Sequence, residues 1–156
     1  MTTMTTKSTM LGFLTAGQRD QLLRAARDVS YPAGRRMFEE GRHADRFWVV
    51  RSGTVVLDLR VPGRRSPAVD TLGPGDLVGW SWLYTPHVWH LGGQTASAVR
   101  AWQFDAASVR RMCAQDPELG RSVEHCVGVA LARRLRASRT RLLSLYGPYS
   151  TADEDF

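Results

Sequence analysis

The chain has 156 residues, 43% of them hydrophobic, which predicts one globular domain with its own core. No run of about 18 apolar residues occurs, which excludes a membrane-spanning helix, and residues 1–10 lack the apolar core of a signal peptide. The formal net charge of +6, carried almost wholly by arginine, allows an anionic partner but does not identify one.

The N-terminal segment is rich in threonine, and we expect residues 1–13 to be a disordered lead-in. The ordered part opens with Thr15, which is followed three residues later by Gln18, the pattern of a capping box at a helix N-terminus. Apolar residues then recur at helical spacing, at Leu22, Leu23, Ala26 and Val29. These signals predict a short helix over residues 16–27.

Short apolar runs separated by glycine and proline turns predict a series of strands after this helix. The predicted strands are residues 29–31, 37–38, 47–50, 54–59, 69–72 and 95–104. Ser52 and Gly53 form a two-residue turn, which predicts a hairpin between the third and fourth of these strands. Strands at intervals of about ten residues are typical of an all-β sandwich or jelly roll.

The segment from residue 75 to residue 94, called the cassette below, is where we expect any pocket. It holds three of the five tryptophans, at Trp80, Trp82 and Trp89. Its glycines indicate tight turns and close backbone approach, and Asp76 with the residues after it predicts a short strand entering a turn. Two interpretations stay open: the tryptophans form an aromatic box for a flat ligand, or they fill the pocket and belong to the core.

The hydrophobic period changes to that of helices at Asp105, which is placed to cap a helix that includes Cys113. The other cysteine, Cys126, also lies among apolar neighbours in a segment with helical spacing. This placement favours small buried thiols in a reducing compartment. We therefore expect a cytoplasmic protein.

A long second helix is predicted over residues 117–146, with Asp116 at its N-cap and a stop at Gly147 and Pro148. Residues 147–156 form an acidic tail. At about 29 residues, or roughly 43 Å, the helix is longer than a small sandwich needs. We expect part of it to pack against a second copy of the chain in a homodimer. The residues predicted for this contact are Val123, Val127, Ala130, Leu131, Leu135 and Leu142.

Several short motifs occur in one order along the chain, and their glycine placements are specific in combination. They are Phe38-Glu-Glu-Gly41, Ala44-Asp45, Phe47-Trp-Val-Val50, Ser52-Gly53-Thr-Val55, Gly73-Pro-Gly-Asp-Leu-Val-Gly79, Asp116-Pro117-Glu118-Leu119 and Ala132-Arg-Arg-Leu-Arg-Ala-Ser138. The chain resembles the cyclic nucleotide-binding domain, most closely the sensor half of bacterial regulators related to the catabolite activator protein. The resemblance covers about residues 14–146.

The resemblance implies a mainly β fold with α: a β jelly roll (double-stranded β-helix) with a short N-terminal helix and a long C-terminal dimerisation helix over residues 117–146. The family's regulators carry a helix-turn-helix domain after the long helix. Because nine residues follow Gly147, we expect a stand-alone cyclic nucleotide-binding-like domain over residues 14–146.

The resemblance also identifies the cassette with the family's phosphate-binding segment, whose backbone N–H groups after Gly79 face an anion. It places a hydroxyl for the purine on the long helix. The candidate ligand-binding residues are Gly75, Asp76, Leu77, Val78, Gly79, Trp80, Ser81, Trp82, His87, Trp89, His90, Gln94 and Ser138.

Two side chains that the family uses for cyclic nucleotides are replaced. In the family, a glutamate after the glycine binds the ribose, and an arginine about ten residues later pairs with the phosphate. Here Trp80 follows Gly79, and no arginine lies between Arg65 and Arg100. The residues near the arginine position are His87, His90 and Gln94. We therefore predict altered or lost cAMP binding, with another nucleotide-like ligand as the alternative.

The expected function is a regulatory, ligand-sensing domain that signals through its C-terminal helix to a partner protein. The alternative is a ligand-free homodimeric interaction module with the same fold. We expect neither an enzyme nor a metal site, because spacing assembles no catalytic set and His87 and His90 lack further ligands. The arginines of residues 133–141 could serve a DNA-associated accessory factor, but we expect no nucleic-acid partner, because aromatic interleaving and a recognition helix are missing.

Overall fold

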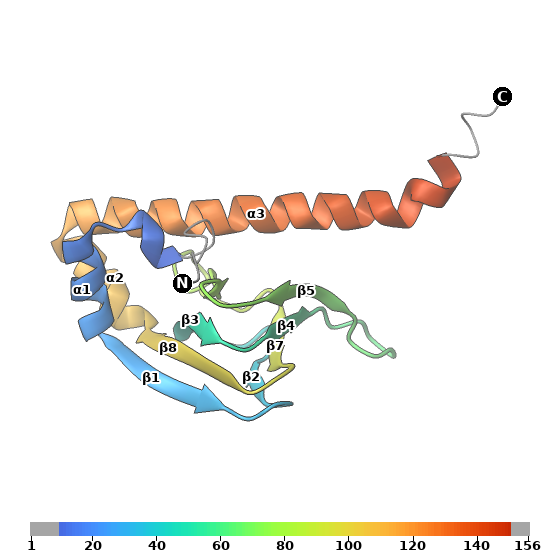
Figure 1. Cartoon of the computed structure of the whole chain (residues 1–156), viewed down its shortest axis with the longest axis horizontal. Helices are drawn as coiled ribbons and strands as arrows, with labels where there is room; N and C mark the ends of the chain where they lie inside the picture. The colour runs from blue at the N-terminus through green and yellow to red at the C-terminus, as the bar shows by residue number, and fades with distance from the viewer. Residues whose placement is uncertain (1–9, 151–156) are drawn as a thin grey trace, which may run out of the picture.

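The computed structural model describes residues 10–150, with side chains to residue 146 (Figure 1). The helices are η1 (Met10–Phe13), α1 (Ala16–Arg24), α2 (Ala106–Gln115) and α3 (Pro117–Ser150). The strands are β1 (Ala26–Tyr31), β2 (Arg36–Phe38), β3 (Arg46–Ser52), β4 (Val55–Asp58), β5 (Ala68–Leu72), β6 (Leu77–Val78), β7 (Gly92–Thr95) and β8 (Val99–Asp105).

The strands form two four-stranded antiparallel sheets, in the orders β1-β8-β3-β6 and β2-β7-β4-β5. Buried side chains from both sheets and from α1, α2 and α3 belong to one hydrophobic core. Its largest fully buried members include Trp48, Trp82, Phe47 and Phe104. The predicted β jelly roll between a short N-terminal helix and a long C-terminal helix is confirmed.

The predicted hairpin around Ser52 and Gly53 is wrong. β3 pairs with β6 and β8, whereas β4 pairs with β5 and β7 in the other sheet. Gly53 has a φ of 90°, and a Cβ at this position would lie 2.1 Å from the carbonyl oxygen of Ala98. The turn residues therefore make the chain cross from one sheet to the other under a neighbouring loop, where only glycine fits.

The N-terminal expectations need two corrections. The last residues of the predicted lead-in are ordered in η1, because Met10 is buried and its N–H donates to the carbonyl of Gly75 at 3.1 Å; residues 1–9 lie outside the described residues. The capping box of Thr15 and Gln18 is confirmed, but α1 ends at Arg24. Residues from Ala26 pair with β8 instead, and this sheet pairing outweighs the helical spacing.

The two C-terminal helices follow in sequence, and the predicted cap is confirmed: the Asp105 side chain accepts from the backbone N–H of Ser108 at 2.9 Å. α3 is 34 residues long and runs through the predicted stop at Gly147. The acidic part of the predicted tail, residues 151–156, lies outside the described residues.

α3 packs at its N-terminal half on α2, η1 and β5, and its C-terminal half extends past the β-sheets (Figure 1). Val123 and Val127 are fully buried in the core of the same chain, and Ala130 packs against it. The first two of these predicted dimer residues therefore face their own domain. Farther along the helix, Leu135 and Leu142 are exposed, while Arg134 still contacts the domain through the carbonyl of Leu77.

Candidate ligand-binding cassette

The cassette connects the two sheets. It starts in β6, whose Val78 pairs with Trp48 of β3, and ends in β7, which pairs with β2 and β4. Its first turn is fixed by the carboxylate of Asp76, which accepts from the N–H of Gly73 at 2.8 Å. The N–H of Gly75 donates to the carbonyl of Val50 at 2.7 Å. Asp76 thus has the structural role of closing the turn at the start of the cassette.

The second half of the cassette is held against residues 41–44 by backbone hydrogen bonds. The N–H of Gly41 donates to the carbonyl of Trp89, and the N–H of Trp89 donates to the carbonyl of Arg42, both at 2.9 Å. The N–H of Ala44 donates to the carbonyl of His87 at 2.7 Å. These bonds position the backbone of Trp89 so that its side chain points inward, where only 5% of it remains exposed.

Trp89 occupies the space in front of Gly79. Gly79 has a φ of 99°, and a Cβ there would lie 2.6 Å from Cζ3 of the Trp89 indole. The other side of the indole stacks on Phe38, with ring centroids 4.3 Å apart and an interplanar angle of 29°. Trp89 is therefore packed between the glycine backbone and a second aromatic ring, in van der Waals contact on both faces.

Trp82 is a core residue. It is fully buried and stacks on Phe47 with a centroid separation of 4.0 Å and an interplanar angle of 12°. Its indole Nε1–H donates to the carbonyl of Gly79 at 3.0 Å, and its own carbonyl accepts from Arg110 at 2.6 Å. Of the two open interpretations for the tryptophans, Trp82 follows the second: its ring is part of the core.

Trp80, Ser81 and His90 form a small cluster at the mouth of the cassette. The half-buried Trp80 indole stacks on the His90 imidazole, with centroids 4.8 Å apart. The buried Ser81 hydroxyl is hydrogen-bonded to Nδ1 of His90 at 3.0 Å. The imidazole is thus held in place from one face and one edge, and its second nitrogen, Nε2, is the group that remains for a ligand.

His87 belongs to a different part of the cassette. It has a φ of 56°, and its N–H donates to the carbonyl of Tyr84 at 2.9 Å. Burial, and then the positive charges of Arg110 and His43, lower the pKa of His87 below its usual value. His87 therefore favours the neutral form, which is a poor partner for a phosphate group.

The space left between these side chains is a cavity of about 20 Å³. Phe38, Leu57 and Arg134 line it together with cassette residues Gly79, Trp80, Ser81, Trp89, His90 and Leu91. A cavity of this volume holds roughly one water molecule. Pockets for small organic ligands are typically about 300–1,000 Å³.

The cavity has four lining residues that the sequence did not predict as site residues, and the charged one is Arg134; the others are Phe38, Leu57 and Leu91. The Arg134 guanidinium, on α3, donates to the backbone carbonyl of Leu77 in β6. Burial lowers the pKa of Arg134, and Asp70 and Asp76 partly oppose this effect. Its spacing of seven and four residues from Val127 and Ala130 was the available signal, because those positions lie on the helix face that covers the domain.

The structure brings only part of the predicted set together. Gly79, Trp80, Ser81, Trp89 and His90 meet at the small cavity, whereas Leu77, Val78 and Trp82 are core residues. Gln94 is exposed on β7, and Ser138 is exposed on α3 and does not line the cavity. A nucleotide-binding role for any of these residues stays a prediction.

Among residues 10–150, no three His, Cys, Asp or Glu side chains gather closely enough to hold a metal ion. No helix in that part of the chain is long and apolar enough to cross a membrane.

Comparison with known proteins identifies the family. The cyclic nucleotide-binding domain family matches residues 28–116. A CRP-like cAMP-activated global transcriptional regulator of Mycobacterium tuberculosis is 30% identical over 124 residues, which are 80% of this chain and 54% of the regulator. The chain thus spans about half the length of that relative.

Solved structures agree with this match. The N-terminal domain of a transcriptional regulator from Streptomyces coelicolor has a TM-score of 0.64 and 27% identity, over 79% of this chain and 85% of that one. A cyclic nucleotide-binding domain from Methylobacillus flagellatus has a TM-score of 0.76 over 84% and 74% of the two chains, and at 17% identity it supports the fold alone. The chain belongs to the cyclic nucleotide-binding domain family, whose matched relatives are regulators.

Proposed function

We propose that this chain is a homodimeric regulatory module in which cyclic nucleotide binding has been lost, because aromatic side chains of the chain itself fill the pocket. Its output is the paired C-terminal helix, which a partner protein reads. The observation that carries this proposal is the packing of Trp89 between Gly79 and Phe38, which leaves about 20 Å³ at the cassette.

The chemistry of the cassette supports the same conclusion. Trp80 stands where the resemblance expects a carboxylate for the ribose, and His90 is one of the residues near the position where it expects an arginine for the phosphate. A hydrogen bond to a charged group contributes about 1.5–3 kcal/mol, so the loss of both charged partners lowers affinity by roughly a thousandfold. Opening the pocket alone would therefore not restore tight binding.

The dimer is inferred from the exposed half of α3. From residue 128 onward, positions spaced alternately by three and four residues form one stripe, as in a coiled coil. This seam comprises Gly128, Leu131, Leu135, Ser138, Leu142 and Leu145. Leu135 is 63% exposed and Leu142 is 53% exposed in the single chain. Covering such leucines with the same stripe of a second copy removes apolar surface from water.

Isothermal titration calorimetry with cAMP and cGMP tests the loss of binding. The wild-type protein should give no saturable heat and no thermal shift at ligand concentrations that saturate the Mycobacterium tuberculosis regulator in the same buffer. Saturable binding of either nucleotide in the micromolar range would refute the proposal and support an altered ligand-sensing domain.

A set of variants tests the reason for the loss. Trp89→Ala empties the pocket, and Trp80→Glu with His90→Arg supplies the two charged groups. The triple variant should bind cAMP at least a hundredfold more tightly than Trp89→Ala, because both volume and charge are then present. If Trp89→Ala alone binds as tightly as the triple variant, missing charge is not part of the explanation.

A further inference from the structure

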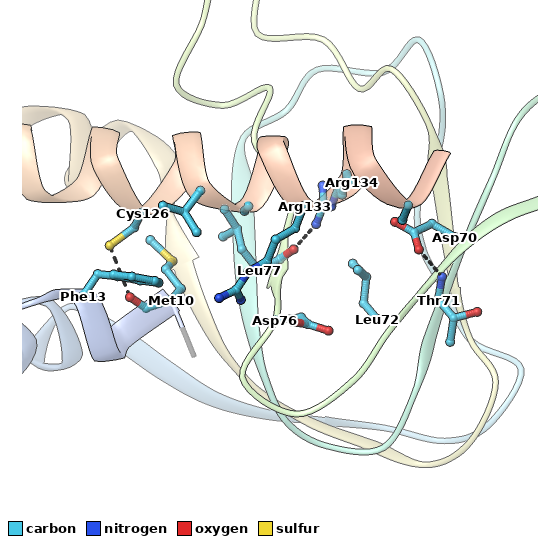
Figure 2. A pocket seen from close by; sticks show the side chains of 13 residues that line it. Met10, Phe13, Asp70, Thr71, Leu72, Asp76, Leu77, Cys126, Arg133 and Arg134 are labelled. Atoms are coloured by element: carbon cyan, nitrogen blue, oxygen red, sulfur yellow. Dashed lines mark hydrogen bonds between the residues drawn. The ribbon is translucent and has the colours of Figure 1, made fainter. Parts of the chain in front are cut away.

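A second cavity, of about 160 Å³, is also lined by Arg134 and by the first residues of the cassette, Asp76 and Leu77. η1, β5, the turn before β6 and α3 enclose it, and Figure 2 shows its walls. It is eight times larger than the 20 Å³ that remain at the cassette (160/20). In contrast to the pocket at the cassette, this cavity is left open by the described side chains, those of residues 10–146.

The walls of this cavity combine apolar surface with balanced charge. Phe13, Leu72 and Leu77 are among its apolar side chains. Two guanidinium groups reach it from α3, and two carboxylates reach it from β5 and from the turn before β6. The charged residues are Arg133, Arg134, Asp70 and Asp76. Both signs of charge are thus present on the walls, which suits a ligand that carries a cationic and an anionic group.

The carboxylates keep hydrogen-bonding capacity. Asp76 accepts from the N–H of Gly73 through Oδ2, and Asp70 accepts from the N–H of Thr71 through Oδ1, both at 2.8 Å. Each of these bonds uses one of the two carboxylate oxygens. No residue in the described part of the chain forms an ion pair with either carboxylate within 4.0 Å. An ammonium group in the cavity could therefore bind the second oxygen of either side chain.

The cation on the opposite wall is only partly satisfied by protein. The Arg134 guanidinium donates to one acceptor, the carbonyl of Leu77, and can make up to five hydrogen bonds. Burial lowers its pKa, and Asp70 and Asp76 oppose that effect from a distance. A carboxylate beside this guanidinium would form charge-assisted hydrogen bonds that a neutral backbone carbonyl does not offer.

We propose that the 160 Å³ cavity binds a small zwitterion of the α-amino acid class. The ammonium group lies toward Asp76 and Asp70, the carboxylate lies toward Arg134, and a short aliphatic side chain contacts Leu72 and Leu77. The volume suits such a molecule, because a cavity of about 150 Å³ accepts a benzene-sized ligand. This inference is independent of the function proposed for the cassette, since it uses a different cavity.

Binding at this site would reach the rest of the module through Arg134. The contact between Arg134 and the Leu77 carbonyl joins α3 to β6, near the start of the cassette. A bound carboxylate would use other N–H donors of the same guanidinium and pull it toward the cavity, away from that carbonyl. The zwitterion would thereby loosen a link between the long helix and the sheet.

Calorimetry and thermal unfolding of the full chain test the proposal with glycine, L-alanine, L-serine, L-valine and L-leucine as probes. At least one amino acid should bind with 1:1 stoichiometry and raise Tm in a saturable manner. Acetate and methylammonium, which each carry only one of the two charges, should give no saturable shift at the same concentrations. If no amino acid binds, or if acetate alone binds equally well, the zwitterion site is refuted.

Two variants locate the binding. Asp76→Asn keeps an acceptor for the N–H of Gly73 and removes only the charge, and Arg134→Gln removes the cation. Each should weaken the best amino acid at least tenfold. Asp20→Asn and Arg136→Gln are matched controls, because both residues are exposed and neither lines the cavity, so affinity should be unchanged. Unchanged affinity in both cavity variants would place the ligand elsewhere and overturn the assignment.

Discussion

The indole of Trp89 lies against the α-carbon of Gly79, so close that a Cβ on residue 79 would meet Cζ3 of the ring at 2.6 Å. Gly79 also has a φ of 99°, a backbone conformation that residues other than glycine rarely adopt. We predict that Gly79→Ala lowers the free energy of unfolding by about 3 kcal/mol, through backbone strain plus displacement of the ring. Urea unfolding followed by tryptophan fluorescence measures this loss.

Gly41→Ala is the matched control for that measurement. Gly41 has a similar φ of 86°, but a Cβ there would meet no atom within 4 Å. Its substitution should therefore cost only the backbone strain, about 1 kcal/mol. Equal losses for the two variants would show that Trp89 does not press on residue 79.

The proposed seam predicts a dimer that a single charge disrupts. Leu135→Glu places a carboxylate in the centre of the stripe in each helix, where it would be buried beside its like-charged counterpart. We expect the dissociation constant to rise at least a hundredfold, as measured by sedimentation velocity over a range of concentrations.

Leu143→Glu controls for the loss of an exposed leucine on the same helix. Leu143 is 70% exposed but lies outside the spacing of the seam, so this variant should associate like the wild type. A wild-type chain that sediments as a monomer at high concentration would remove the homodimer from the proposed function.

The N-cap of α2 predicts a dependence of stability on pH. The hydroxyl of Ser108, and then its backbone N–H, lower the pKa of Asp105 by hydrogen bonding to its carboxylate. Because the folded pKa is lower than the unfolded one, the charged form stabilises the protein above about pH 4, and this contribution is lost as the pH falls through the folded pKa.

Asp105→Ala should cost about 1 kcal/mol at pH 7. The difference from wild type should shrink between about pH 4 and pH 2, because the wild-type carboxylate then becomes protonated. Urea unfolding at a series of pH values measures both curves. A cost that stays constant down to pH 2 would contradict a charge-dependent cap.

The burial of Cys126 predicts that its thiol reacts slowly with disulfide reagents. Burial raises the pKa of this thiol to about 11, and the thiol donates to the carbonyl of Met10 at 3.2 Å. At pH 8 about one thiol in a thousand is therefore ionised, and the thiolate is the reactive form. In the Cys113→Ser variant, Cys126 should react with a disulfide reagent at least a hundredfold more slowly in the native protein than in urea. Similar rates in both states would mean that η1 does not cover the thiol.

Features set by neighbouring residues could be predicted from the sequence. The capping box of Thr15 and Gln18 and the cap by Asp105 depend on residues three apart, and both are present. Strand pairing depends on contacts across the fold. Ser52 and Gly53 therefore predict a turn, but no local pattern indicates that β4, the strand after this turn, belongs to the other sheet.

The sequence predicts a candidate cassette, but the packing of its side chains could not be predicted. The aromatic content of the cassette could not distinguish pocket from core, because the distinction depends on Phe38 and Phe47, which stack on Trp89 and Trp82 from distant strands. Arg134 was read as one of several surface arginines. Its contact with Leu77 arises only when α3 packs across β6.

Because α3 is long, a small tilt of the helix at its buried part moves its far end by a larger distance, as in a lever. Its fulcrum is the buried stretch around Val127, and Leu145 stands 18 residues farther along, or about 27 Å at 1.5 Å per residue. A tilt of 5° at the fulcrum would therefore move that end by roughly 2 Å, about half the separation of two packed methyl groups. Adjustments too small to disturb the core can thus reset which side chains meet at the far end of the helix.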